Sequence, residues 1–109
     1  MIHIRLYGGP DRIRGFIIWG HAGFAPRGGD IVCAGVSAVA TTALIGLHRR
    51  IPGYVRYGIL PQGLMICRLR GVIPKALAGE AQVILSVMAL GLQSIRSSHA
   101  DFVAISYRR

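Results

Sequence analysis

The sequence predicts a single α+β domain, residues 1–109, in which two helices pack on one mixed β-sheet. The chain has 109 residues, which is long enough for one hydrophobic core and too short for two. Stretches of alternating apolar and polar residues predict strands, and two long apolar stretches predict helices. The order of these elements along the chain is ββαββαβ, which is typical of a helical layer on one sheet.

The N-terminal segment predicts a β-hairpin followed by a loop. Residues 2–7 alternate apolar and polar side chains, and residues 13–19 form a second apolar stretch. Between them, Gly8-Gly9-Pro10-Asp11 has the residue types of a turn. Residues 21–29 are rich in glycine and have no regular pattern, so they predict an irregular loop.

The first helix is expected to begin after Asp30 and to continue to about Arg50. Aspartate is a common N-cap residue because its carboxylate accepts hydrogen bonds from free amides of the first turn. Arg49 and Arg50 suit the negative end of a helix, and Pro52-Gly53 would stop it. Residues 31–47 carry no charge, but much of this stretch is Ala, Gly, Ser and Thr, so we expect a core helix and no membrane span.

The C-terminal half predicts two strands, a second helix and a final strand. The strands are expected at residues 54–58 and 64–70, and the helix at residues 75–97. Pro74 suits the first turn of that helix. Residues 102–107 again favour a strand, which completes the sheet.

Composition and charge narrow the classes of function. Hydrophobic residues make up 52% of the chain, so disorder is not expected. Thirteen Lys and Arg residues oppose four Asp and Glu residues, and the net charge of +9 suggests an anionic partner such as RNA. The arginines are scattered along the sequence and do not alternate with aromatic residues as in a stacking platform. Nucleic acid is therefore an open alternative and not the expected partner.

The N-terminal sequence shows no signal peptide, and the chain has two cysteines, Cys33 and Cys67. We therefore expect a cytoplasmic protein with free thiols. No metal site is expected, because His21 and Cys33 have no obvious third ligand and the other histidines are dispersed. No cofactor is expected either, since the glycine-rich loop lacks the Gly-Lys-Ser/Thr sequence of a phosphate-binding loop.

Cys33 and His21 are the candidate catalytic pair. If Asp30 caps the helix, Cys33 lies in the first turn, where the positive helix end and free amides favour a thiolate over a thiol. A histidine on the preceding loop can fold back over the sulfur, stabilise the anion and later protonate a leaving amine. Helix-start amides are also candidate donors to an oxyanion.

Simpler interpretations of the same residues remain open. A cysteine in an apolar helix is often a small buried hydrophobe, and a lone loop histidine is often only solvated. Cys67, between Ile66 and Arg68, is expected to be packed in the core. Ser37 lies one turn after Cys33 on the same helix face, where it would either line a pocket or pack against the next helix.

The segments Gly20-His21-Ala22 and 29–38, which contain Asp-Ile-Val-Cys-Ala, resemble the signature of the ribosomal-processing cysteine protease Prp family (YsxB-like proteins). The interval from His21 to Cys33 and the position of Asp30 both match that family. Glu80-Ala81-Gln82 is similar to another family feature, and the length and element order also agree. The resemblance therefore covers the whole chain and is most specific in residues 20–38.

This resemblance implies a homodimeric endopeptidase that removes an N-terminal extension from the precursor of the twenty-seventh large-subunit ribosomal protein. It implies that Cys33 is the nucleophile and His21 the general base. Asp30 would support the site, and Ser37 is a weaker supporting candidate. Phe24 and Trp19 are expected to contribute apolar contacts to the bound extension.

The chain departs from the family pattern in two respects. Residues 22–29 contain no acidic residue that would orient His21, and the net charge is strongly positive where relatives are often acidic. A positive enzyme would repel a basic ribosomal substrate. The net charge of +9 and the abundance of Arg over Lys also motivate the alternative to the protease, a non-enzymatic, basic, ribosome-associated or RNA-binding module.

Overall fold

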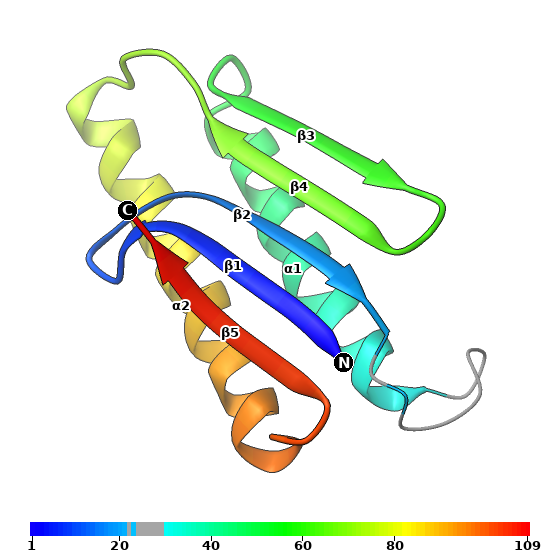
Figure 1. The fold of residues 1–109 in the computed structure, drawn as a ribbon. Helices are drawn as coiled ribbons and strands as arrows, with labels where there is room; N and C mark the ends of the chain where they lie inside the picture. The colour runs from blue at the N-terminus through cyan, green and yellow to red at the C-terminus, as the bar shows by residue number, and fades with distance from the viewer. Residues whose placement is uncertain (22, 24–29) are drawn as a thin grey trace.

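The computed structural model describes residues 1–21, 23 and 30–109 and contains five strands and two helices (Figure 1). The strands form one sheet in the order β3-β4-β2-β1-β5. The element order confirms the predicted ββαββαβ fold. The bounds are β1 (Ile2–Gly9), β2 (Arg12–Gly20), α1 (Ile31–Arg50), β3 (Val55–Leu60), β4 (Leu64–Leu69), α2 (Lys75–Ser98) and β5 (Val103–Arg108).

The predicted element bounds agree with these to within two residues at each end. The first helix begins one residue after Asp30, as the capping argument requires. Pro74, which was expected in the first turn of α2, is instead its N-cap residue, with φ −51° and ψ 142°. A proline fits this position because its fixed φ is compatible with the extended cap conformation.

The sheet is mixed because its strands pair in two ways. β1 pairs with β2, β2 with β4, and β4 with β3, all antiparallel, whereas β5 lies parallel to β1. Strands β2 and β4 are separated by the whole of α1 and β3 in sequence. Their pairing brings the end of β2 beside the start of β4, with Ile18 opposite Met65.

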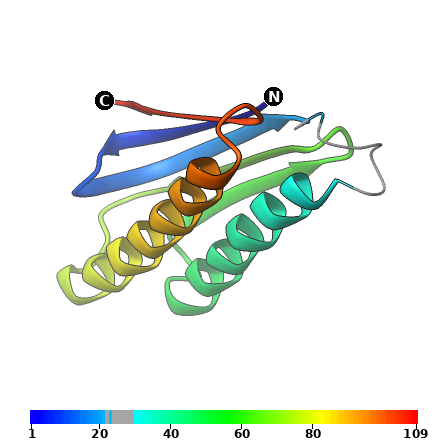
Figure 2. The same ribbon diagram turned by 90° about the horizontal axis from the view of Figure 1, so that it is seen from below.

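Both helices cover the same face of the sheet and run antiparallel to each other (Figure 2). Glycines on each helix allow close contact with the other. A Cβ atom on Gly46 of α1 would lie 3.6 Å from Ile84 of α2, and one on Gly91 of α2 would lie 3.2 Å from Val39 of α1. In the part of the chain that the structure describes, no helix covers the other face of the sheet (Figure 2).

The core lies between the sheet and the helices. Leu6 and Phe16 from the sheet, Leu47 from α1, and Leu85 and Leu92 from α2 are fully buried there. Each such side chain stabilises the fold by about 1.5–3 kcal/mol relative to an exposed position. By length and composition alone, both helices pass the test for a membrane span, but buried helices of soluble cores pass it too. In this fold, the apolar side chains on the inward faces of α1 and α2 pack against the sheet as part of the core.

Polar contacts of α2 join it both to the sheet and to α1. The Gln82 side chain in α2 accepts from the Ile13 N–H at 2.8 Å and donates to the Ile13 carbonyl at 2.7 Å. Arg50, at the end of α1, forms an ion pair with Glu80 near the start of α2. These contacts give the Glu80-Ala81-Gln82 segment, which resembles a family feature, a structural role in joining α2 to the sheet and to α1.

Candidate active site

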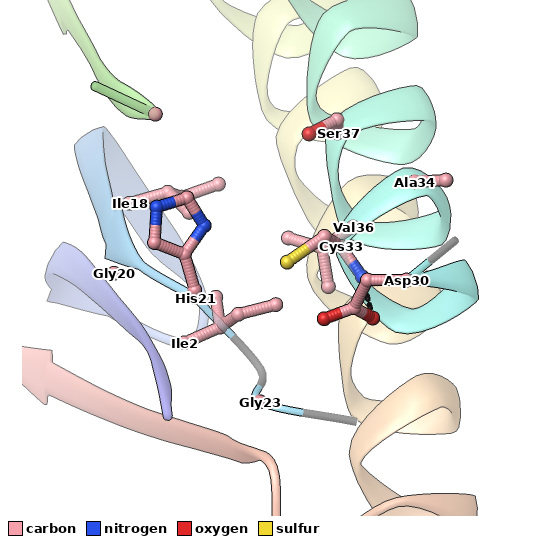
Figure 3. Close-up of a pocket in the computed structure, with 11 residues that line it drawn as sticks. Ile2, Ile18, Gly20, His21, Gly23, Asp30, Cys33, Ala34, Val36 and Ser37 are labelled. Carbon is pink, nitrogen blue, oxygen red and sulfur yellow. Dashed lines mark hydrogen bonds between the residues drawn. The ribbon is translucent and has the colours of Figure 1, made fainter. Parts of the chain in front are cut away.

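A pocket of about 370 Å³ lies at one end of the sheet, on the side that carries the helices (Figure 3). The end of β2, the N-terminus of α1 and the β3–β4 turn meet there. His21 and Cys33, which are twelve positions apart in the sequence, both line this pocket. The fold therefore brings the two predicted catalytic side chains to one cavity.

Cys33 lies in the first turn of α1 and is only partly buried. Its sulfur points from the helix across the pocket, toward the side on which His21 lies (Figure 3). At this position the positive end of the α1 dipole favours a negative charge on sulfur. A partly exposed thiol at a helix start has the access and the local field that a nucleophile requires.

His21 directly follows β2, and Gly20 sets the direction in which the chain leaves the sheet. Gly20 has φ +93°, which favours glycine, and a Cβ atom there would lie 2.4 Å from the carbonyl oxygen of Met1. A side chain at residue 20 would therefore force the strand end apart. The chain thus bends at Gly20, in a conformation that only glycine adopts without strain, and this bend places His21 at the pocket.

Gly63 of the β3–β4 turn lies directly beside the His21 ring. A Cβ atom on Gly63 would be 3.7 Å from His21 Cε1, and Gly63 has φ +80°. The strands predicted at residues 54–58 and 64–70 leave this residue in the connection between them. Turn chemistry indicates a glycine with positive φ, but its contact with His21 depends on the non-local pairing of β2 with β4.

Asp30 caps α1 and is almost fully buried, with 6% of its surface exposed. Its Oδ1 accepts from Val32 N at 2.9 Å and from Cys33 N at 3.0 Å, and its carbonyl accepts from Ala34 N at 3.1 Å. The capping prediction is confirmed. The same bonds engage the amides of residues 32–34, so an oxyanion bound at this helix start would have to share or replace these partners.

Ser37 and a group of apolar side chains complete the described pocket wall. Ser37 lies one turn after Cys33, and its hydroxyl points to the same side of α1 as the sulfur (Figure 3). Ile2, Ile18 and Val36 contribute apolar surface. Such a wall suits an extended peptide, with aliphatic contacts beside a thiol and a hydroxyl.

The two residues expected to contact substrate have different outcomes. Phe24 lies outside the described residues, so its predicted role stays a prediction. Trp19 is on the opposite face of the sheet from Cys33, because it alternates with Ile18, which faces the helices and lines the pocket. Trp19 instead stacks on His3, with ring centroids 5.0 Å apart. Trp19 is not among the residues that line the pocket, so this placement does not support its predicted contact with substrate.

Cys67 is a core residue, as expected, and is 2% exposed. Burial in β4 raises the pKa of its thiol to about 12. It is therefore a neutral thiol at any physiological pH and does not compete with Cys33 as a nucleophile. Among the described residues, no group of three His, Cys, Asp or Glu side chains is arranged to hold a metal ion.

A histidine facing an accessible thiol at a helix start, on a small α+β scaffold, defines the class of cysteine hydrolases. The family model described as cysteine protease Prp matches residues 1–104. The chain belongs to this family and is a cysteine protease. A search among curated proteins found no significant match.

Solved structures with the same fold support this family membership. The chain is similar to the essential ribosomal processing protease Prp from S. aureus in complex with a covalently linked product peptide (28% identity, TM-score 0.78, covering 99% of this chain and 100% of that one). It is also similar to that protease in complex with a substrate peptide (29% identity, TM-score 0.68, 99% and 100% covered). A Streptococcus mutans protein shares the fold at 21% identity, with TM-score 0.79 and 99% and 94% covered.

Proposed function

We propose that this cysteine protease removes the N-terminal extension from the precursor of the twenty-seventh large-subunit ribosomal protein. The observation that carries the proposal is the meeting of Cys33 and His21 in one pocket with apolar walls. The similarity to a ribosomal processing protease, whose structures hold a substrate peptide and a covalently linked product peptide, supports the substrate class.

In the proposed reaction, His21 takes the proton of the Cys33 thiol, and the thiolate attacks the carbonyl carbon of the scissile peptide bond. The tetrahedral intermediate collapses when the C–N bond breaks, and the imidazolium of His21 gives its proton to the departing amine. A thioester then links the extension to Cys33. Water, deprotonated by His21, attacks this thioester and releases the extension as a carboxylate.

Supporting roles follow from the contacts of the neighbouring residues. Asp30 holds the first turn of α1, and so the backbone of Cys33, through its two carboxylate hydrogen bonds. Ser37 supplies a hydroxyl on the same helix face. We assign the apolar part of the substrate to the wall formed by Ile2, Ile18 and Val36, and Phe24 remains a proposed further contact.

The enzyme is proposed to act as a homodimer in the cytoplasm, where ribosomal precursors are made. Two cysteines that form no disulfide favour this compartment. Family membership sets aside the alternative of a non-enzymatic module. The net charge of +9, which motivated this alternative, is not explained by the peptidase activity.

The test is cleavage of a peptide that spans the extension and the mature N-terminus of the ribosomal protein from the same genome. Mass spectrometry is expected to find one cut, at the junction of extension and mature protein. Cys33→Ala should abolish cleavage, and His21→Ala should lower kcat by at least about 100-fold, the usual scale of general acid–base catalysis. Cys67→Ser is the matched control and should retain activity.

Two outcomes would contradict the proposal. If Cys33→Ala folds like the wild type, by circular dichroism, and still cleaves the peptide, Cys33 is not the nucleophile. If the wild type cleaves a scrambled junction peptide as fast as the natural one, the substrate assignment is wrong even though the chain is a protease.

A further inference from the structure

The face of the sheet that the helices leave uncovered gathers arginine and aromatic side chains from distant parts of the sequence. Strand alternation turns Ile4 and Leu6 of β1 toward the core and His3, Arg5 and Tyr7 to the opposite face. The pairing registers extend this face across all five strands. One row of it, read from β5 to β3, is Arg108–Tyr7–Gly15–Arg68–Arg56.

The centre of this row is a hollow of about 380 Å³ above Gly15, whose lining includes Tyr7, Arg14, Ile66 and Arg68. Glycine is required at residue 15, because a Cβ atom would lie 2.5 Å from the carbonyl oxygen of Cys67. The floor of the hollow is therefore backbone. Tyr7 is 36% exposed and Ile66 is 43% exposed, so an aromatic ring and an aliphatic side chain border the hollow in contact with solvent.

The charges around the hollow are all positive. Arg56 and Arg68 are direct cross-strand partners, and like charges in such a pair destabilise a sheet unless an anion lies between them. No acidic residue lies in any of the five strands. Of the four acidic residues, Asp11 and Asp101 lie in turns and Asp30 caps α1. The fourth, Glu80, forms an ion pair with Arg50.

We propose that this uncovered sheet face binds a single-stranded polynucleotide. One base would enter the hollow beside Tyr7, and the flanking phosphates would lie on Arg56, Arg68 and Arg108. Sheets that display aromatic rings between basic side chains bind single strands in this way, because every base has a face to stack and every nucleotide a negative charge. Arginine suits phosphate because its planar fork donates two hydrogen bonds.

A polynucleotide fits this face better than an acidic protein or a lipid surface. The hollow is concave and only a few residues wide, whereas a bilayer needs protruding apolar groups. An acidic peptide would use the arginines but leave the hollow beside Tyr7 empty. RNA is chosen over DNA only because the proposed substrate is a ribosomal protein; the binding face itself does not depend on that function.

Binding at this face would leave the peptidase pocket free. The pocket lies on the helix side of the sheet, and the hollow lies on the other side. A protein with net charge +9 repels a basic ribosomal precursor. An RNA strand that binds both the enzyme and the basic precursor would bring them together in spite of this repulsion. The positive charge of the chain would then favour substrate encounter.

The test is fluorescence anisotropy with a labelled 16-nucleotide single-stranded RNA and the full-length protein over a series of salt concentrations. With three phosphate contacts at about 0.7 each, the log–log slope of affinity against salt should be about −2. Arg56→Gln with Arg68→Gln should weaken binding at least tenfold and reduce the slope to about −0.7. The matched control, Arg49→Gln with Arg96→Gln, removes the same charge from exposed helix positions and should bind within about twofold of wild type.

Tyr7→Ala separates stacking from charge. It leaves the net charge unchanged and should weaken RNA binding about tenfold while leaving the salt slope intact, because stacking on an aromatic side chain does not release counterions. Circular dichroism melting and Cys33 alkylation check that each variant keeps the fold and the pocket.

Each remaining outcome decides against some part of the proposal. If the Arg56→Gln/Arg68→Gln and Arg49→Gln/Arg96→Gln variants lose RNA affinity equally, net charge alone accounts for the binding. That result would overturn the assignment of the site to the uncovered sheet face. Equal binding of poly-glutamate, of phosphatidylglycerol vesicles or of duplex RNA would overturn recognition of a single strand. Equal affinity for DNA of the same sequence supports the face but overturns the choice of RNA. None of these readouts requires peptidase activity, so failure of the proposed function would be seen separately.

Discussion

The two cysteines lie in contrasting surroundings. Cys33 is partly exposed in the first turn of α1, and Cys67 is buried in β4 with its pKa raised to about 12 by desolvation. We expect iodoacetamide at neutral pH to alkylate Cys33 alone, with an apparent pKa below the ordinary value of about 8.5. His21→Ala should raise that apparent pKa only in part, because the helix-end contribution remains.

The measurement is a pH profile of labelling on wild type, Cys67→Ser and His21→Ala, followed by mass spectrometry of the labelled peptide. The Cys67→Ser profile should match the wild type, because Cys67 stays protonated throughout the range from pH 5 to 10. A wild-type Cys33 that titrates at or above the free value would be an ordinary packed thiol. The catalytic assignment would then be wrong.

Asp30 combines a structural and an electrostatic effect at the same helix end. Asp30→Ala removes the acceptor of two amide hydrogen bonds and should lower the free energy of unfolding by about 1–2 kcal/mol. Asp30→Asn keeps a capping oxygen and should cost less. Because the Asn variant also removes a negative charge beside Cys33, it should lower the apparent pKa of the thiol.

Urea unfolding and the labelling profile measure these two effects of Asp30 independently. A comparable loss of stability in both variants would mean that the carboxylate charge, and not the cap geometry, stabilises α1. A rise in the Cys33 pKa in the Asn variant would mean that Asp30 acts mainly by orienting a positive partner of the thiolate.

At the scale of elements, Gln82 joins α2 to the strand layer. Its side chain bonds both the N–H and the carbonyl of Ile13, next to the β1–β2 turn. Gln82→Ala should lower the free energy of unfolding by about 1–3 kcal/mol, because two partly buried backbone groups lose their partners. Gln93→Ala, which removes one exposed bond to the Tyr107 hydroxyl, is the matched control and should change stability by less than about 1 kcal/mol.

The measurement for Gln82 is again the urea midpoint, with the Cys33 labelling rate as a second readout. The labelling rate should not change, since Ile13 and the pocket lie at opposite ends of β2. Equal midpoints for Gln82→Ala and Gln93→Ala would contradict the structural explanation of the Glu80-Ala81-Gln82 segment.

At the scale of the whole molecule, the two faces of the sheet have separate chemistry. The helix-covered face forms the core and, at one end, the pocket of Cys33 and His21 (Figures 2 and 3). The uncovered face collects positive charge without any acidic side chain in its strands. If the uncovered face binds a polyanion as proposed, the peptide pocket on the helix side of the sheet stays free.

The sequence by itself determined the elements of this protein and the residues of its candidate catalytic pair. Apolar periodicity is local, so it predicts each strand and helix to within two residues of its observed bounds. Capping is also local, and Asp30 therefore located the start of α1 and the position of Cys33 in its first turn. The resemblance of residues 20–38, which include His21, Asp30 and Cys33, indicated the family.

Only the tertiary structure decided which of these elements are neighbours. Strand pairing depends on backbone hydrogen bonds that are the same for every sequence, so alternation cannot tell which strands lie side by side. That pairing places Gly63 against His21 and aligns Arg108, Tyr7, Arg68 and Arg56 in one row. The face on which the helices pack leaves Trp19, which alternates with Ile18, on the side away from the pocket. Arginines that are scattered in the sequence thus share one surface, because the sheet joins strands that are far apart in the chain.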